Sequence, residues 1–161
     1  MRILEGTAGG HGQRFAVVVS RYHDFVTRPL LDGALAALAD AGVASDDITV
    51  AHVPGSFELP VAAQRLAETG RFAAVTCLGC LIRGGTPHFE YIASAVAHAL
   101  AAASTATGVP IAFGVLTTNT VEEAIERAAP GPSNKGREAA RSAVEMAALM
   151  RALDAAVERL A

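Results

Sequence analysis

The sequence contains no tryptophan, few aromatic residues and no cluster of positive charge. Aromatic residues make up 5% and hydrophobic residues 52% of its 161 positions, and the net charge is −3. Because the 13 basic residues are scattered, the basic surface that neutralises the phosphates of a nucleic acid is missing. We therefore expect no nucleic-acid partner. The length and apolar content predict one domain, 1–161, with a single core.

The sequence also lacks a long uninterrupted hydrophobic run. Its most apolar region, Ala93–Leu116, is broken by hydroxyl residues and by the Gly-Val-Pro turn at 108–110, which makes it unsuitable for crossing a bilayer. Residues 1–14 are rich in glycine and lack the apolar core of a signal peptide. We therefore expect a soluble, cytoplasmic protein that has no membrane partner.

The chain has two cysteines, Cys77 and Cys80, in a Cys-x-x-Cys pattern. They fall on a predicted strand, where an offset of three residues places side chains on opposite faces, about 10 Å apart. That separation exceeds the roughly 7 Å that a disulfide can bridge, so two buried free thiols are predicted. No pair of histidines has convincing metal-ligand spacing, and no metal site is predicted.

Continuous apolar runs alternate with helical periodicity along the whole chain. The predicted strands are Phe15–Ser20, Asp47–Val53, Phe72–Ile82 and Pro110–Leu116. The predicted helices are Pro29–Ala41, Leu59–Thr69, His88–Thr107, Val121–Ala129 and Lys135–Leu160. Strands buried on both faces and joined by helical crossovers predict a four-stranded parallel sheet covered by helices on each side, a three-layer α/β/α fold.

In open parallel sheets, ligands bind beyond the carboxyl ends of the strands. The segments that follow the four predicted strands are Arg21–Asp24, Pro54–Glu58, Arg83–His88 and Thr117–Asn119. Gly84 and Gly85 permit close backbone approach before a helix start, whose free amides and dipole favour an anion. This turn predicts a small phosphate site, although an ordinary strand-to-helix turn also uses glycine.

Several side chains at the same strand ends carry useful chemistry. The imidazole of His88 can transfer protons, unless it is merely a solvated or capping residue. Ser56 and Glu58 can bind a polyhydroxylated ligand, or they can cap the following helix, and both roles are compatible. Tyr22 and Phe57 offer faces on which a planar heterocycle can stack.

The last predicted helix is apolar over more than half of its circumference, which exceeds what one sheet contact requires. A second buried face on this helix predicts oligomerisation. Its larger apolar residues are Val144, Met146, Ala147, Leu149, Met150 and Leu153.

Five separated segments together resemble the lumazine synthase family. They are RYHDF, PGSFELP, LGCLIRGGTPHFEYI, FGVLTTNTVEEAIER and SNKGREAA, and they run in order between Phe15 and Met150. The resemblance implies a flavodoxin-like fold and the condensation of 5-amino-6-(D-ribitylamino)uracil with 3,4-dihydroxy-2-butanone 4-phosphate. The implied product is 6,7-dimethyl-8-ribityllumazine, formed in the penultimate step of riboflavin biosynthesis without a metal or organic cofactor.

The resemblance also implies roles for residues on the phosphate side of the site. His88 matches the proton-transfer residue, and Gly85 and Thr86 match the phosphate pocket. Arg127 matches a phosphate-binding arginine that stabilises the leaving group, and Lys135 adds to the positive field.

Further substrate contacts are implied on the pyrimidine side. Those matching the ribityl-binding segment are Ser56, Phe57 and Glu58, and those along the pyrimidine are Cys80, Leu81 and Ile82. Phe113, like Arg127, is expected to come from a neighbouring subunit. From the residues alone, however, Phe113 reads as sheet core and Arg127 as an exposed helix residue. Tyr22-His23 departs from the Phe/Trp-Asn pair that is common in the family; tyrosine keeps the stacking surface.

Members of the family form pentamers, and in some of them twelve pentamers build a hollow 60-subunit shell. The short joint at 130–134 favours the shell here, and the arm at 1–14 is expected to add a strand to a neighbouring subunit. Riboflavin synthase is the implied cargo or pathway partner. Two other readings stay open: a structural shell of the same fold with little or no activity, and a flavin or lumazine carrier.

Overall fold

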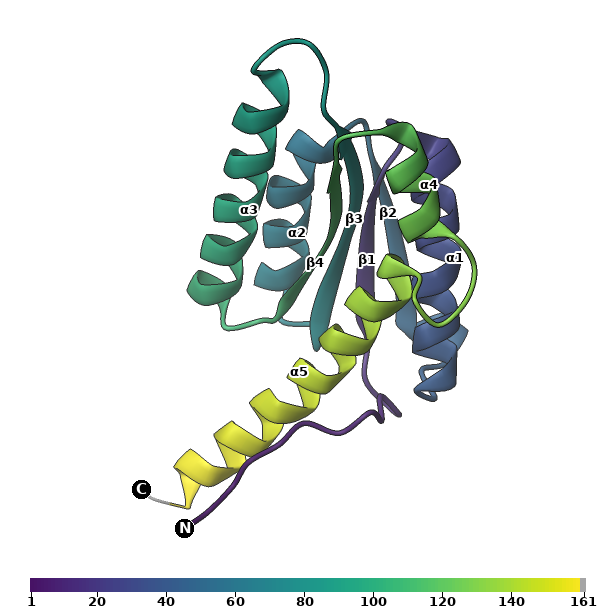
Figure 1. The fold of residues 1–161 in the computed structure, drawn as a ribbon. Coiled ribbons are helices and arrows are strands. Elements are labelled where there is room, and N and C mark those ends of the chain that lie inside the picture. Colours follow the sequence, from purple (N-terminus) through teal and green to yellow (C-terminus); the bar gives the residue numbers. More distant parts are fainter. Residues whose placement is uncertain (160–161) are drawn as a thin grey trace.

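A computed structural model describes residues 1–159 and shows a four-stranded parallel sheet within them. Its strands are β1 (Phe15–Ser20), β2 (Ile48–Val53), β3 (Ala74–Ile82) and β4 (Ile111–Thr118). Their order in the sheet is β2-β1-β3-β4 (Figure 1). The crossover that follows β1 leads to β2, whereas the crossover that follows β3 leads to β4 on the opposite side of the sheet. The switch point, at which such sheets bind ligands, therefore lies between β1 and β3.

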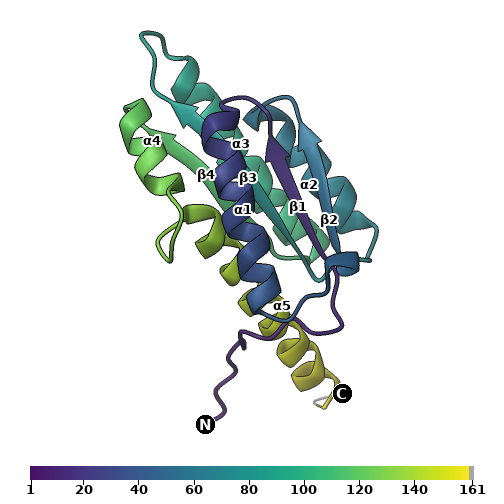
Figure 2. The same cartoon turned by 90° about the vertical axis from the view of Figure 1, so that its right-hand side faces the viewer.

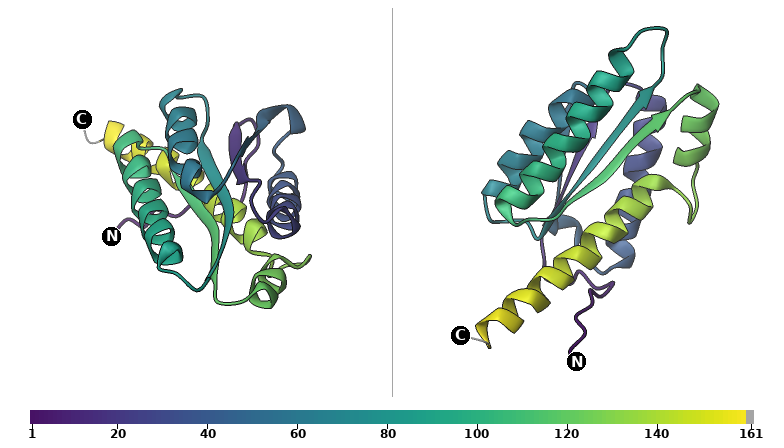
Figure 3. Two further views of the ribbon diagram at one scale, coloured as in Figure 1. Left: turned by 90° about the horizontal axis from the view of Figure 1, so that it is seen from above. Right: turned by 60° about the vertical axis from the view of Figure 1, so that its left-hand side comes forward.

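Helices cover both faces of the sheet and complete the predicted three-layer flavodoxin-like fold. They are α1 (Asp24–Asp40), α2 (Leu59–Glu68), α3 (His88–Thr107), α4 (Val121–Ala128) and α5 (Lys135–Glu158), with 3₁₀ turns η1 (Ser45–Asp47) and η2 (Ser56–Glu58). Seen from above, α2 and α3 form one outer layer, and α1 and α4 lie on the other side of the sheet (Figure 3). Figure 2 shows α1 in front of the sheet, with α4 beside β4.

The central strand β1 explains why the sequence shows continuous apolar runs. Phe15, Val17 and Val19 pack into the core beneath α1, α4 and α5, whereas Ala16 and Val18 pack beneath α2 and α3. All six residues of β1 are buried, because side chains alternate between two covered faces. A β-branched run suits such a strand better than an alternating one.

The two cysteines are free and buried, as predicted. Cys77 packs in the core beneath α2 and α3, whereas Cys80 packs beneath α1, α4 and α5. Burial raises the pKa of the Cys77 thiol to about 12 and that of Cys80 to about 11. Both residues therefore act as small apolar side chains of the strand.

The main error in the predicted elements concerns the start of α1. The sequence predicts a start at Pro29, where apolar residues begin to recur at spacings of three and four, but α1 begins at Asp24 and holds Pro29 within it. His23 precedes the helix in the left-handed conformation, with φ 59°. The other ends agree with the prediction or differ by at most two residues, and the predicted end of the last helix at Leu160 lies outside the described residues.

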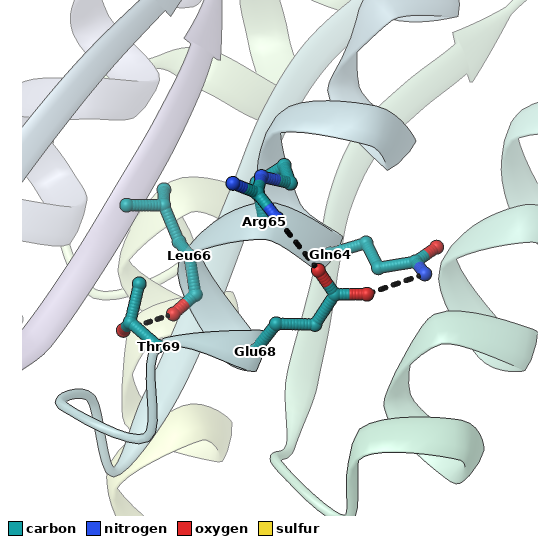
Figure 4. A network of polar contacts seen from close by, with 5 residues as sticks. All are labelled: Gln64, Arg65, Leu66, Glu68 and Thr69. Atoms are coloured by element: carbon teal, nitrogen blue, oxygen red, sulfur yellow. Dashed lines mark hydrogen bonds and ion pairs between the residues drawn. The ribbon is translucent and has the colours of Figure 1, made fainter.

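The end of α2 is held by local contacts far from the strand carboxyl ends. The Glu68 carboxylate accepts a hydrogen bond from Gln64 at 2.8 Å and pairs with Arg65 at 3.4 Å. The Thr69 hydroxyl donates to the carbonyl of Leu66 at 2.6 Å (Figure 4). These exposed contacts close the helix and contribute little to global stability.

The second half of α5 extends beyond the sheet (Figure 1), and the N-terminal arm at 1–14 approaches this helix at Gly6. The arm holds no helix or strand of its own, and Gly6 packs closely against the backbone of Glu145. The exposed apolar residues on α5 are Met146, Leu153 and Val157. Among the described helices, none is long and apolar enough to cross a membrane.

Candidate active site

A cavity of about 990 Å³ opens at the carboxyl ends of the strands. It is bordered by the residues that follow β1, β2 and β3 and by the first turns of α3. It brings together eight residues that the sequence analysis places in the site: Tyr22, Ser56, Phe57, Glu58, Leu81, Ile82, Thr86 and His88. The strand-end rule therefore locates a physical cavity that is large enough for a substrate of metabolite size.

The turn after β2 forms one wall of this cavity. Glu58 accepts a hydrogen bond from the backbone N–H of Gly55 at 2.9 Å and so caps the 3₁₀ turn η2 while also bordering the cavity. Neither Glu58 nor Ser56 caps the following helix α2 with its side chain, so that alternative is wrong. The Ser56 hydroxyl is buried and has no partner within the protein. A Cβ on Gly79 of β3 would lie 2.6 Å from that hydroxyl, so glycine is what lets the turn pack onto the sheet. An unpaired buried hydroxyl beside a carboxylate is suited to a hydroxylated ligand.

The loop from β3 to α3 forms the opposite wall and arches above the sheet (Figure 1). Pro87 is the N-cap residue of α3, and Thr86 and His88 border the cavity with exposed side chains. No atom lies within 4 Å of a Cβ built on Gly84 or Gly85, so the backbone there is open to close approach. A 20-residue helix directs its first free N–H groups and positive dipole end to this point.

Arg83 holds the base of this loop, a role the sequence analysis does not assign. Its Nε donates to Asn119 Oδ1 at 3.0 Å, and its guanidinium pairs with Glu90 and lies 4.5 Å above the Phe89 ring centre. Arg83 therefore connects the end of β4 to the first turn of α3. The contact to Asn119 spans 36 positions, a separation at which no local pattern could reveal it.

The turn after β1 places two rings at the cavity. The Tyr22 and His23 ring centres lie 4.4 Å apart, and Phe25 stacks edge-on to His23 at 5.7 Å. Desolvation lowers the pKa of His23, so burial favours its neutral form. Among the described residues other than glycine, His23 is alone in having a positive φ, and such outliers concentrate at functional sites.

The cavity extends along α3 beyond the residues predicted from the sequence. His88, Ile92 and Ala95 line it at helical spacing, and Tyr91 and Val121 complete the wall. The spacing of four and then three residues is visible in the sequence, and it marks the helix face that continues from the predicted imidazole.

A second, smaller recess of about 250 Å³ lies at the outer strand β4 and the α4–α5 joint. It gathers Phe113, Arg127, Lys135 and Glu138. Lys135, the only lysine in the chain, pairs with Glu138 at 2.7 Å, and Arg127 donates to the carbonyl of Glu123 at 3.1 Å. The recess therefore holds two cations and one carboxylate around an aromatic ring.

The sequence-predicted site residues thus fall into two groups on one chain. Phe113 is 46% exposed, so its reading as sheet core is wrong, whereas Arg127 is an exposed helix residue as expected. Neither residue borders the large cavity. Gly85 lies between cavity residues without bordering the cavity itself, and the Cys80 side chain points into the core beneath α1. In residues 1–159, no group of three His, Cys, Asp or Glu side chains could hold a metal ion.

Fold and site together define a class: a flavodoxin-like α/β domain with a small-molecule cavity at the switch point of its sheet. Residues 12–151 match the family model of 6,7-dimethyl-8-ribityllumazine synthase, and the chain belongs to this family.

Two relatives that carry that enzyme name cover nearly the whole chain. The protein from Syntrophus aciditrophicus (strain SB) is 54% identical over 149 residues, which are 92% of this chain and 97% of the relative. The protein from Desulfatibacillum aliphaticivorans is 46% identical over 145 residues, 90% of this chain and 94% of the relative.

Proposed function

We propose that this chain condenses 5-amino-6-(D-ribitylamino)uracil with 3,4-dihydroxy-2-butanone 4-phosphate to give 6,7-dimethyl-8-ribityllumazine. Family membership supports the reaction. The observation that carries it at the site is one cavity holding an imidazole at a helix N-terminus, an unpaired buried hydroxyl and a carboxylate. These are the groups needed for proton transfer, anion binding and recognition of a ribityl chain.

The proposed reaction releases two molecules of water and one inorganic phosphate. The amine attacks the ketone and forms an imine with loss of one water; the carbon–oxygen bond to phosphate then breaks with loss of inorganic phosphate; ring closure onto the second nitrogen releases a second water. Each loss requires a proton to be delivered or removed. His88, which borders the cavity at the first turn of α3, is the residue we assign to these transfers.

The pyrimidine and its ribityl chain are assigned to the walls after β1 and β2. Tyr22 presents an exposed ring for stacking. The free oxygen of Glu58 would accept a hydrogen bond from a ribityl hydroxyl, and the Ser56 hydroxyl would donate one to another. Leu81 and Ile82 border the cavity between these walls.

The phosphate is assigned to the boundary between two copies of the chain. Gly85 and Thr86 lie at the anion-attracting start of α3, whereas Arg127 and Lys135 lie in the separate recess at β4. We assign that recess, with Phe113, to the large cavity of a neighbouring subunit. The cations would then face the helix start and stabilise the departing phosphate.

A ring of such head-to-tail contacts closes as a homopentamer, and the short joint at 130–134 favours further assembly of twelve pentamers into a shell. Riboflavin synthase is the proposed partner or cargo, because it would consume the lumazine product. The reading as an inactive shell is not favoured, since a container needs neither His88 nor a cationic recess.

Mixing the purified protein with the two substrates tests the activity. Lumazine absorbance and free phosphate should rise together, well above the rate of the spontaneous reaction. Arg127→Ala should raise the KM for the phosphorylated ketone at least tenfold, the loss expected for one charged contact to phosphate, and leave pyrimidine binding nearly unchanged. Arg65→Ala, at the far end of α2 (Figure 4), is the matched control. A wild-type rate no faster than the spontaneous one would reject the proposed enzyme.

A further inference from the structure

We propose that Asn134 is a positioning residue that sets the geometry of Arg127 and Lys135, and through them the affinity for the ketone phosphate. The inference rests on the proposed function, in which these two cations bind that phosphate. Asn134 itself is 1% exposed and borders neither the large cavity nor the recess at β4. It therefore acts on substrate only through the residues that it holds.

A single carboxamide ties together three helices. Asn134 Nδ2 donates to the carbonyls of Ala128 at 2.7 Å and Ala129 at 3.3 Å, at the end of α4, and to Pro29 of α1 at 3.1 Å. Its Oδ1 accepts from the backbone N–H of Arg137 at 3.0 Å and so caps α5. The same side chain thus satisfies the last carbonyls of one helix and a first amide of the next.

We call the Asn134 carboxamide with its four hydrogen-bond partners the three-helix clamp. Two glycines leave the space in which this clamp packs against α1. A Cβ on Gly33 would overlap the Asn134 carboxamide, and a Cβ on Gly136 would overlap the carbonyl of Leu30. Both positions lie within helices, where glycine costs up to about 1 kcal/mol relative to alanine. The close approach of α5 and Asn134 to α1 explains why glycine occupies them.

The clamp lies between the two cations along the chain. Arg127 directly precedes Ala128, whose carbonyl Asn134 binds, and Lys135 directly follows Asn134. The segment 130–133 between them is exposed throughout and contains Gly131 at φ 130°. Within residues 128–134, the Asn134 carboxamide makes the only side-chain hydrogen bonds that join the end of α4 to the start of α5.

Asn134→Ser separates positioning from capping. Serine is also a good N-cap residue and can still accept from Arg137, but it is too short to reach the carbonyls of α4 and α1. We expect the KM for the phosphorylated ketone and the inhibition constant of inorganic phosphate to rise about tenfold. The KM for the pyrimidine should stay within about twofold, because the walls after β1 and β2 do not touch the clamp.

A double variant tests whether Asn134 acts through Arg127. If it does, Asn134→Ser should add little to the loss already caused by Arg127→Ala, because both changes remove the same interaction. Gly33→Ala displaces the carboxamide without removing it and should give the same selective rise, whereas Gly9→Ala, which meets no atom within 4 Å, should not. Gly33→Ala also provides the test if Asn134→Ser fails to fold.

Two results would overturn the role of Asn134: equal rises in both KM values, or additive losses in the double variant. Light scattering on each variant shows whether the wild-type assembly is kept. A wild-type protein without activity would instead overturn the proposed function, so the two failures are distinguishable.

Discussion

His88 is the residue whose replacement should affect the chemical step most. It borders the cavity at the first turn of α3. We expect His88→Gln to lower kcat about 100-fold through loss of proton transfer, with little change in either KM. His98→Gln is the control, because His98 lies on the same helix and bonds its own backbone at Ser94. A loss that appears mainly in KM would contradict a role in proton transfer.

His23 should make stability depend on pH. Desolvation lowers its pKa from 6.5, so the unfolded chain takes up the proton first as the pH falls. Its contribution to the free energy of unfolding is therefore complete above pH 6.5 and is lost as the pH falls from 6.5 through the lower folded-state pKa. His23→Asn should show a smaller drop in melting temperature between pH 7.5 and 5.5 than wild type. Equal drops would contradict this assignment.

Which site residues can be predicted from sequence depends on how local their signal is. Ser56, Glu58 and His88 follow predicted strands directly, so the strand-end rule is enough to place them in one cavity. Cys80 also lies near a strand end, but its side chain faces the core, because alternation along β3 decides the direction. Arg83 owes its role to Asn119, which directly follows β4 and lies 36 positions away, a pairing that no local sequence pattern predicts.

Among the helices and strands, the contact between α5 and β4 depends on one glycine. A Cβ on Gly114 would lie 2.6 Å from Leu78 Cδ2, 2.9 Å from the carbonyl oxygen of Cys77 and 3.1 Å from the Cβ of Ala139. Gly114→Ala should therefore force strand and helix apart and lower the free energy of unfolding by about 1–3 kcal/mol.

Urea denaturation at fixed protein concentration measures this change, because assembly makes stability depend on concentration. Gly9→Ala, in open space, should change stability by less than about 0.5 kcal/mol. Equal stability of the two variants would show that the sheet absorbs the extra methyl group.

The boundaries of the helices and strands show how far sequence patterns can predict the fold. Strands β1 and β3 and helix α3 are recognisable because they are long and apolar, or because glycine and proline bracket them. The start of α1 is missed because the helix is predicted only from the apolar spacing that follows Pro29, whereas α1 begins five residues earlier and contains Pro29. Its carbonyl is one of those that Asn134 binds, so this irregularity lies at the three-helix clamp.

At the scale of the whole molecule, one chain exposes an apolar helix face and holds its site residues in two separate places. Met146, Leu153 and Val157 are exposed apolar side chains of α5, as expected from a last helix that is apolar over more than half of its circumference. The cavity and the cationic recess are separate sites on the chain. Sequence patterns predict which residues bind substrate, but only the folded chain shows that Arg127 and His88 border different hollows.

This separation predicts that two impaired variants partly restore each other's activity. In a ring of head-to-tail interfaces, co-assembly of His88→Gln with Arg127→Ala at equal amounts joins an intact His88 to an intact Arg127 in about a quarter of the sites. Lumazine formation, measured after joint refolding at a ketone concentration well below the wild-type KM, should therefore recover to about a quarter of the wild-type level. Refolded alone, Arg127→Ala should keep at most about a tenth and His88→Gln about a hundredth of that level. As a control, the double variant mixed equally with wild type should also leave about a quarter of the sites intact, against about half if each chain works alone. No recovery in the first mixture, with half the activity kept in the second, would place both residues in a site built by a single chain.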